Sequence, residues 1–310
     1  MNSRRRLLLR LAQAVVTIGL LVLVWRVMDG SDAARVLLTA DPRWLLAALL
    51  ALTAHTLLAA ERWRVTARAL GIVITLRHAW REYYLSQLVN QTLPGGVVGD
   101  AGRAVRSRGQ AGLSIAAQTV IVERVAGQIA VLVVMDVAFA ITAAVPEGPE
   151  WPSWLLMTVV AMTAVGLLGL GLVLVAGKLP GRVGKLMTDF TSAAAIALVG
   201  RPVILRQVVL STGTTACILA AFALCARSVG LNLPVAAVVT LVPLILLTML
   251  VPITVSGWGL REGAAATLLP LVGATASASL AASVAFGIIG LLTVVPGVVI
   301  LWRQSQGHPK

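Results

Sequence analysis

The sequence has few of the side chains that form covalent cross-links or hold metal ions. Its two cysteines, Cys217 and Cys225, are eight residues apart within one predicted membrane span, where a disulfide between them would require a broken helix. Its three histidines, His55, His78 and His308, do not have the spacing of metal ligands. We therefore expect neither a disulfide nor a metal site.

Catalytic signatures are also missing. The chain has no G-x-S-x-G, H-E-x-x-H or GxxxxGKS/T motif, and no paired-aspartate motif of the kind that handles pyrophosphate. It contains only 12 carboxylates, several of them in predicted loops, which leaves few groups for metal-dependent phosphoryl chemistry. The sequence therefore predicts that the chain is not an enzyme, and that it has no catalytic residues and no cofactor.

Charged residues make up only 12% of the chain, whereas 58% is hydrophobic and the mean hydropathy is +0.93. This composition predicts an all-α polytopic membrane protein, a single membrane domain over 1–310 with six to eight transmembrane helices. Apolar runs long enough to cross a bilayer lie at about 7–28, 44–60, 115–144, 153–176, 207–227 and 278–301. Shorter or Pro/Gly-broken apolar stretches lie at 83–99, 234–256 and 262–274.

The formal charge of +13 is explained by topology rather than by nucleic acid. If the N-terminus is cytoplasmic, most of the 25 basic residues fall on the cytoplasmic side, and the intervening loops at 29–43 and 146–152 are acidic. We therefore expect a multi-pass protein of the cell (inner, cytoplasmic) membrane with both termini in the cytoplasm. The basic residues would then attract anionic lipid headgroups, and no nucleic-acid partner is expected.

The stretch YYLSQLVNQTLPGGVVGDAGRAVRSR, residues 83–108, is unusually polar for this chain. Basic residues flank its apolar part 83–99 on both sides, so both ends favour the cytoplasm. Because this part is too short to cross and return, and Pro94, Gly95 and Gly96 interrupt it, we interpret it as a re-entrant hairpin. The alternative is one short, kinked span that leaves Arg103 to Arg108 on the other face.

A second stretch, MLVPITVSGWGLREGA at 249–264, matches the first. Pro94, Gly99 and Arg103 have the spacing P-x4-G-x3-R, and Pro252, Gly257 and Arg261 repeat it 158 residues later. Upstream, ALGIVI (69–74) and SVGLNL (228–233) stand at nearly the same offset. Two unrelated Pro/Gly kinks are the alternative to a repeat.

Counting spans places residue 71 in the cytoplasm and residue 230 outside, so the two copies would run in opposite senses. We therefore predict an inverted repeat, with half one at about 44–145, half two at about 207–302, and a connecting helix and basic cytoplasmic loop at 153–206. In transporters, interrupted segments at matching positions of two such halves indicate a substrate site near the middle of the membrane.

We expect a polar cavity between the two broken segments. Arginine offers donors that match phosphate oxygens, and backbone amides at the glycines add to such a site, so a phosphate headgroup is the expected ligand. The predicted substrate-binding residues are Asn90, Gln91, Gly95, Gly96, Asp100, Arg103, Glu123, Arg124, Ser256, Gly257, Trp258, Gly259, Arg261 and Glu262.

Charged groups inside membrane spans are costly, and each needs a partner. Adjacent residues point about 100° apart on a helix, so Glu123 with Arg124, and Arg261 with Glu262, are not expected to neutralise each other directly. Structural ion pairing across helices is the alternative role for all four. Arg103 has the alternative role of a cytoplasmic anchor. Asp136 is interpreted as a satisfied core carboxyl or one near the outer interface.

Three motifs, NQTLPGGVVGDAGRA, VIVERVAG and VPITVSGWGLREGA, together resemble the flippase-like membrane domain family, to which the transmembrane region of lysylphosphatidylglycerol synthase belongs. The resemblance implies a polytopic bundle with two facing re-entrant segments that moves a polar lipid between leaflets. It places in the family's conserved positions the residues Asn90, Gln91, Pro94, Gly95, Gly96, Gly99, Asp100, Arg103, Glu123, Arg124, Pro252, Ser256, Gly257, Gly259, Arg261 and Glu262. Because no aminoacyl-transfer domain follows the membrane region in this sequence, lysyl transfer is not expected.

We therefore predict a flippase-like transporter of a phosphate-bearing lipid, with the bilayer and a possible enzyme of a lipid-modification pathway as its partners. Three alternatives remain open. The chain would instead be an integral membrane enzyme acting on a lipid-linked phosphate or sugar, with Asp100 or Glu123 as acid or base. It would otherwise be a secondary transporter for a soluble anion, or a non-transporting subunit of a glycolipid pathway.

Overall fold

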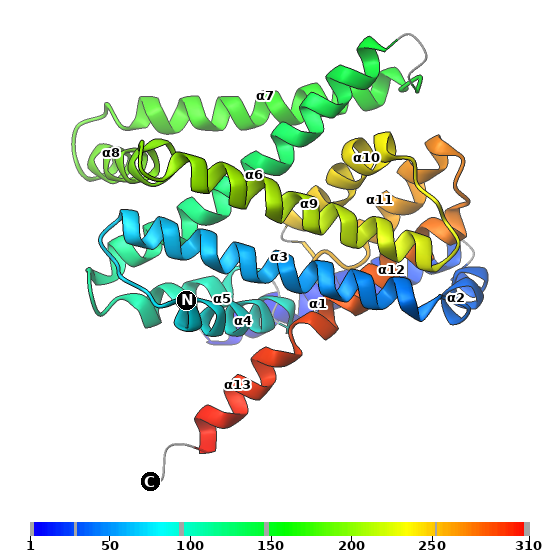
Figure 1. Ribbon diagram of the computed structural model, residues 1–310, viewed down its shortest axis with the longest axis horizontal. Helices are drawn as coiled ribbons and strands as arrows, with labels where there is room; N and C mark the ends of the chain where they lie inside the picture. The colour runs from blue at the N-terminus through cyan, green and yellow to red at the C-terminus, as the bar shows by residue number, and fades with distance from the viewer. Residues whose placement is uncertain (1–2, 28–29, 93–95, 146–148, 252, 307–310) are drawn as a thin grey trace. The chain divides into compact units, whose positions relative to one another are not determined.

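A computed structural model of the chain describes residues 3–27, 30–92, 96–145, 149–251 and 253–306. All regular structure in these ranges is helical (Figure 1). The α-helices are α1 (Ser3–Val27), α2 (Gly30–Leu38), α3 (Pro42–Ala69), α4 (Leu76–Thr92), α5 (Val98–Ser107), α6 (Gly112–Ala144), α7 (Ser153–Ala176), α8 (Arg182–Ala194), α9 (Ile204–Ser228), α10 (Val235–Leu247), α11 (Leu260–Leu268), α12 (Ala276–Thr293) and α13 (Val295–Gln306). Three short irregular helical turns are η1 (Ala195–Val199), η2 (Thr248–Leu250) and η3 (Leu269–Val272).

Five stretches of these helices are long and apolar enough to cross a membrane, and each covers a predicted span. They are Pro42–Ala69, Gly112–Ala144, Ser153–Ala176, Ile204–Ser228 and Ala276–Gln304. The first predicted span lies in α1, whose described apolar part is Val15–Val27. Helices satisfy their own backbone hydrogen bonds, which is why apolar runs of this length fold as helices in lipid. The predicted all-α polytopic membrane fold is confirmed.

The broken stretches form helices too short to cross a bilayer alone. At 1.5 Å per residue, α4 is about 26 Å long, α5 about 15 Å, α10 about 20 Å and α11 about 14 Å, against a hydrocarbon core of about 30 Å. Pro94 and Gly95, at the first break, and Pro252, at the second, lie outside the described residues. Whether the two stretches are re-entrant stays a prediction.

The same order of elements occurs twice along the chain. A long helix ends at a glycine with positive φ, Gly71 (φ 86°) after α3 and Gly230 (φ 79°) after α9. The backbone amide of the residue after each glycine closes the helix end: Ile72 N donates to Ala67 O (2.9 Å), and Leu231 N donates to Ala226 O (3.0 Å). A broken pair of short helices and another long apolar helix follow in both cases. Whether the two parts form an inverted repeat stays a prediction.

The chain divides into two compact units that are each discontinuous in sequence. Unit 1 comprises Met1–Leu57, Trp80–Arg103 and Ala216–Lys310, and unit 2 comprises Leu58–Ala79 and Ala104–Thr215. Each unit therefore contains residues of both predicted repeat halves. The unit boundaries fall inside α3, α4, α5 and α9, where the sequence shows no change of composition.

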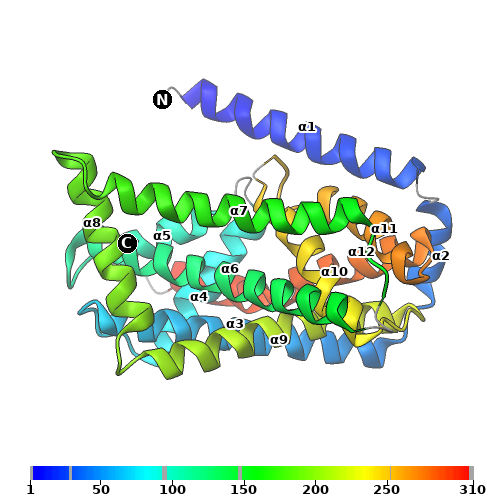
Figure 2. The same ribbon diagram turned by 90° about the horizontal axis from the view of Figure 1, so that it is seen from above.

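In unit 1, α12 forms a helical core. It contacts α2 and α11, and Figure 2 shows α11 beside it. Its buried face is built mostly from small residues, which let helices approach closely. These are Ser279, Ala281, Ala282, Ser283 and Ala285. Phe286 of this face packs against Phe222 of α9, with ring centroids 5.5 Å apart.

In unit 2, α6, α7 and α8 contact one another, and the end of α3 and the start of α9 complete the unit. Trp63 is fully buried, and its indole N–H donates to Thr119 Oγ1 of α6 (3.1 Å). Gln207 of α9 donates to Thr66 Oγ1 of α3 (2.9 Å). The outer surface of α7 is apolar, as expected for lipid contact, with exposed Val160, Val165, Leu167, Leu168 and Leu170.

Candidate functional site

The first broken segment holds a buried cluster around the carboxylate of Asp100. Asp100 accepts hydrogen bonds from Ser86 Oγ (2.9 Å), Asn90 Nδ2 (2.9 Å) and Arg103 Nη2 (3.0 Å). Arg103 is 0% exposed, and its guanidinium lies 4.6 Å from the centre of the Tyr83 ring. The cluster therefore joins α4, which provides Tyr83, Ser86 and Asn90, to α5, which provides the ion pair.

Glycine at position 99 makes this cluster possible. Gly99 N donates to Asn90 Oδ1 (2.7 Å), so the amide of Asn90 binds both the start of α5 and Asp100. A Cβ at position 99 would overlap the carbonyl oxygen of Ser86 and lie 2.9 Å from Asn90 Oδ1. The glycine of the P-x4-G-x3-R spacing is thus needed for close approach of α5 to α4.

The second broken segment holds a cluster of similar composition around Glu262. Its Oε2 accepts from Gly259 N (2.7 Å), and its Oε1 accepts from Arg261 Nε (3.0 Å) and Ser283 Oγ of α12 (3.1 Å). Arg261 Nη2 also pairs with Glu262, and Arg261 Nε donates to Ser283 Oγ (3.0 Å). Each broken segment therefore combines an arginine, a carboxylate and a serine of another helix.

The expectation that Arg261 and Glu262 do not neutralise each other directly is wrong. Glu262 is the third residue of α11, and its side chain turns back to cap the free amide of Gly259 at the helix start. In that position its carboxylate lies beside the guanidinium of Arg261, although the two Cα–Cβ bonds diverge. The 100° argument applies to side chains that extend away from a helix, and this one folds back along it.

Arg261 is enclosed by aromatic rings. Its guanidinium lies 5.1 Å from the centre of the Trp258 ring and 5.3 Å from that of Phe286. Trp258 also lies against Gly287, where a Cβ would come within 2.6 Å of the indole. Trp258 therefore covers the second arginine, as Tyr83 covers the first.

The two broken segments meet within unit 1. Ser256 Oγ donates to Gln91 Oε1 across a distance of 3.0 Å, and Gln91 Nε2 lies 3.5 Å from where Gly290 of α12 would carry a Cβ. The backbone before α11 turns through Ser256 (φ 52°), Gly257 (φ 77°) and Gly259 (φ 89°), which aims Ser256 at α4. A left-handed conformation at a non-glycine residue is uncommon and typical of functional sites.

Glu123 belongs to a third buried cluster, in unit 2. It accepts from Arg62 Nε (3.3 Å) and Nη2 (2.9 Å), and Arg62 Nη1 donates to Thr214 Oγ1 (3.0 Å). This pairing between helices agrees with structural ion pairing, the alternative role of Glu123. Arg62 is a buried partner that was not among the predicted site residues. Arg62 directly follows the predicted span at 44–60, a position that also suits a cytoplasmic charge, so the sequence does not single it out.

The other predicted site residues are placed as follows. Gly96 adopts a positive φ of 58°, and Gly95 lies outside the described residues. Arg124 is half-buried on α6, next to Glu123. Asp136, interpreted as a satisfied core carboxyl, accepts hydrogen bonds from Thr163 Oγ1 of α7 at both oxygens (2.9 and 3.0 Å). The part of the chain that the structure describes contains no cluster of three or more His, Cys, Asp or Glu residues that suits a metal ion.

The two unit 1 clusters are buried networks of charge-assisted hydrogen bonds. Arg103 pairs with Asp100 and Arg261 pairs with Glu262, and such pairing offsets the cost of a charge in a low-dielectric environment. A phosphate oxygen presents the same acceptors to a guanidinium as a carboxylate does.

Comparison with known proteins gives one clear finding. The family described as "Lysylphosphatidylglycerol synthase TM region" matches residues 10–297 of the chain. None of the curated proteins compared with the chain matches it.

Proposed function

Because the chain belongs to the family of the lysylphosphatidylglycerol synthase transmembrane region, we propose that it moves a phosphate-bearing lipid between membrane leaflets. The headgroup would be bound at the two broken segments of unit 1, while the tails stay in the bilayer. The protein would lie in the cell membrane with both termini in the cytoplasm.

One observation carries this proposal: the contact between Gln91 and Ser256 brings together two segments that each contain an arginine–carboxylate pair. Arg103 and Arg261 are 0% and 2% exposed, so neither serves simply as a surface anchor. Buried arginines inside a membrane protein mark binding sites or transport pathways more often than stability elements.

The energetics favour a mechanism of partner exchange. A charged headgroup in hydrocarbon without partners is prohibitively unfavourable, because its hydration is lost. Donors already fixed in the membrane lower that cost, and the carboxylates Asp100 and Glu262 keep those donors neutralised while no lipid is bound. The lipid phosphate would displace one carboxylate, bind the guanidinium, and leave when the carboxylate returns.

The test is headgroup movement in proteoliposomes that contain a fluorescent phospholipid, followed by quenching from the outside. We expect Arg103→Ala and Arg261→Ala to reduce the rate to that of protein-free vesicles. Arg35→Ala, which removes an exposed arginine of α2 in the same unit, is the matched control and should keep the wild-type rate.

Because removing one partner of a buried pair leaves an unpaired charge and can unfold a protein, neutral pairs extend the test. Asp100→Asn/Arg103→Gln and Arg261→Gln/Glu262→Gln keep polar side chains that can form hydrogen bonds, without their charges and with a shorter side chain at each arginine position. We expect folded, inactive proteins, and wild-type rates in both would refute the mechanism. A change of lipid mass in the same vesicles would instead favour the alternative of an integral membrane enzyme.

A further inference from the structure

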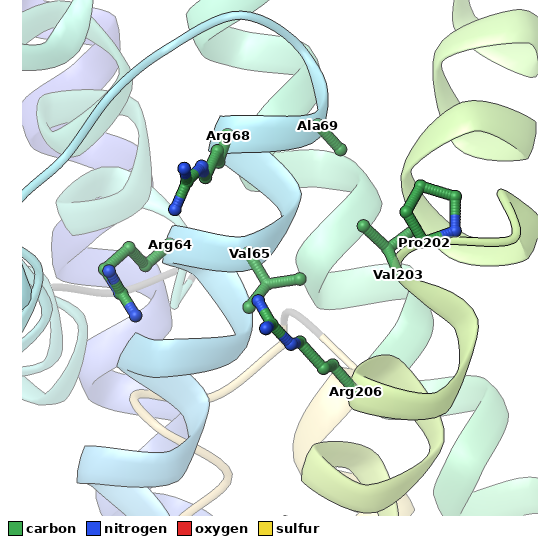
Figure 3. A pocket seen from close by; sticks show the side chains of 7 residues that line it. All are labelled: Arg64, Val65, Arg68, Ala69, Pro202, Val203 and Arg206. Carbon is green, nitrogen blue, oxygen red and sulfur yellow. The ribbon is translucent and has the colours of Figure 1, made fainter.

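Unit 2 contains a basic cavity that has no part in the site proposed above. It has a volume of about 250 Å³ and lies between the end of α3 and the start of α9. Figure 3 shows Arg64 and Arg68 one turn apart on α3, and Arg206 reaching from α9 towards Val65. The lining residues are Arg64, Val65, Arg68, Ala69, Pro202, Val203 and Arg206.

The cavity has a surplus of positive charge. Arg64 is paired with Glu61, with Nε–Oε2 and Nη2–Oε1 distances of 2.6 and 2.7 Å. Arg68 and Arg206 are exposed, and neither forms an ion pair with another residue in the described ranges. Two guanidinium groups are therefore available to an anion that enters between the helices.

The walls of the cavity combine these cations with apolar surface. Val65, Ala69, Pro202 and Val203 form its apolar part. A free anion gains nothing from such a surface, whereas the glycerol and first methylene groups of a lipid do. Its volume is below the roughly 300–1,000 Å³ of typical small-molecule pockets, which suits one headgroup rather than a whole lipid.

The position along the helices places the cavity at headgroup depth. The helix α3 ends at Ala69, beyond its apolar run at about 44–60, and α9 begins at Ile204, so the cavity lies where both helices would leave the hydrocarbon. The distribution of basic residues predicts that this end faces the cytoplasm, the side where anionic lipids attract basic segments. Basic pockets between transmembrane helices on that side are typical binding sites for anionic headgroups.

We propose that this cavity binds the phosphate of an anionic lipid headgroup, held by Arg68 and Arg206 and supported by Arg64. Arginine forks bind phosphate through paired, charge-assisted hydrogen bonds. The site shares no residue with the broken segments, so lipid binding at the cavity can be tested whether or not the protein moves lipid between leaflets.

The proposal is tested with a phosphatidylglycerol that carries a photoreactive group next to its headgroup, added to the purified full chain in nanodiscs. We expect cross-links in residues 61–70 and 200–208, located by peptide mass spectrometry. Arg68→Gln/Arg206→Gln should reduce the yield there at least tenfold. Arg182→Gln/Lys185→Gln, which removes two exposed cations of α8 in the same unit, should leave it within about twofold.

Two further experiments determine whether the bound phosphate belongs to a lipid headgroup or comes from solution. A photoreactive diacylglycerol, with the same tails and no phosphate, should not label these segments. If millimolar inorganic phosphate removes the labelling by phosphatidylglycerol, the site binds phosphate from solution as well as from lipid. If it does not, the headgroup of a lipid is the ligand.

Three results would overturn the proposal. These are labelling elsewhere only, equal loss of labelling in both double variants, or equal labelling by diacylglycerol. Loss of lipid movement in Asp100→Asn/Arg103→Gln with unchanged labelling at 61–70 and 200–208 would show that the two sites are separate.

Discussion

The contribution of an arginine–carboxylate pair to the stability of this protein depends on how deeply the pair is buried. Arg62 and Glu123 form a pair whose side chains are 5% and 1% exposed, whereas Arg64 and Glu61, on the same helix, are 31% and 26% exposed. Exposed pairs contribute roughly 0–1 kcal/mol, because water and salt screen them. Breaking a buried pair leaves an uncompensated charge and costs about 3–5 kcal/mol.

We therefore predict that Arg62→Ala lowers the free energy of unfolding by about 3–5 kcal/mol, and that Arg64→Ala lowers it by no more than ~1 kcal/mol. Reversible denaturation in detergent, followed by circular dichroism, measures both. Arg62→Met/Glu123→Leu should recover most of the loss, since it removes both charges. Equal effects of the two alanine substitutions would contradict the assignment.

At the same scale, the sequence predicts that Asn90, Asp100 and Arg103 belong together, but it does not predict the partners of residues that are far apart in the chain. Asn90, Asp100 and Arg103 were chosen together, and they do form one cluster. Arg62 and Glu123 are separated by 61 residues, and no local pattern connects them. Ser283 approaches Glu262 only because α12 packs against α11, which is a tertiary contact that no sequence spacing encodes.

Among the elements, the two broken segments show best how much of the local structure the sequence predicts. Pro and Gly predicted where the apolar stretches at 83–99 and 234–256 break, because these residues interrupt helical hydrogen bonding. The short helices α4, α5, α10 and α11 confirm that neither stretch is a continuous long helix. The contact between them depends on the left-handed backbone at Ser256, which nothing in its residue type predicts.

The contact between the segments can be measured with a double-mutant cycle. We predict that Gln91→Ala and Ser256→Ala are coupled by about 0.5–1.5 kcal/mol, the usual worth of one hydrogen bond. The free energies of unfolding of the two single variants, the double variant and the wild type give this value. Thr92→Ala with Ser256→Ala is the control cycle, because Thr92 bonds to its own helix and should not couple. Additive effects of Gln91→Ala and Ser256→Ala would show that the segments do not meet.

At the scale of the whole molecule, composition alone predicted the fold class and most of the spans. The family resemblance, stated from three motifs, is confirmed over residues 10–297. The division into two units was not predicted, since its boundaries lie inside helices such as α3 and follow packing rather than sequence.

The two interpretations of the first broken segment, a re-entrant hairpin or a short kinked span, predict different sides of the membrane for the residues that follow it. In a variant without native cysteines, we expect Arg108→Cys to react with a membrane-impermeant maleimide only after cells are permeabilised. Arg77→Cys, before the first broken segment, should behave in the same way, and Asp32→Cys should react in intact cells. Labelling of Arg108→Cys in intact cells would mean that the first broken segment crosses the membrane.

The ion pairs of the two unit 1 clusters have an electrical consequence for the proposed transport. Because Arg103 and Arg261 are already paired with Asp100 and Glu262, a monoanionic headgroup that moved as we propose would add its own negative charge to the cluster it enters. A membrane voltage acts on that charge with about 2.3 kcal/mol per 100 mV. In a cell whose interior is negative, the passage of such a lipid towards the outer leaflet would be driven by voltage, without any nucleotide.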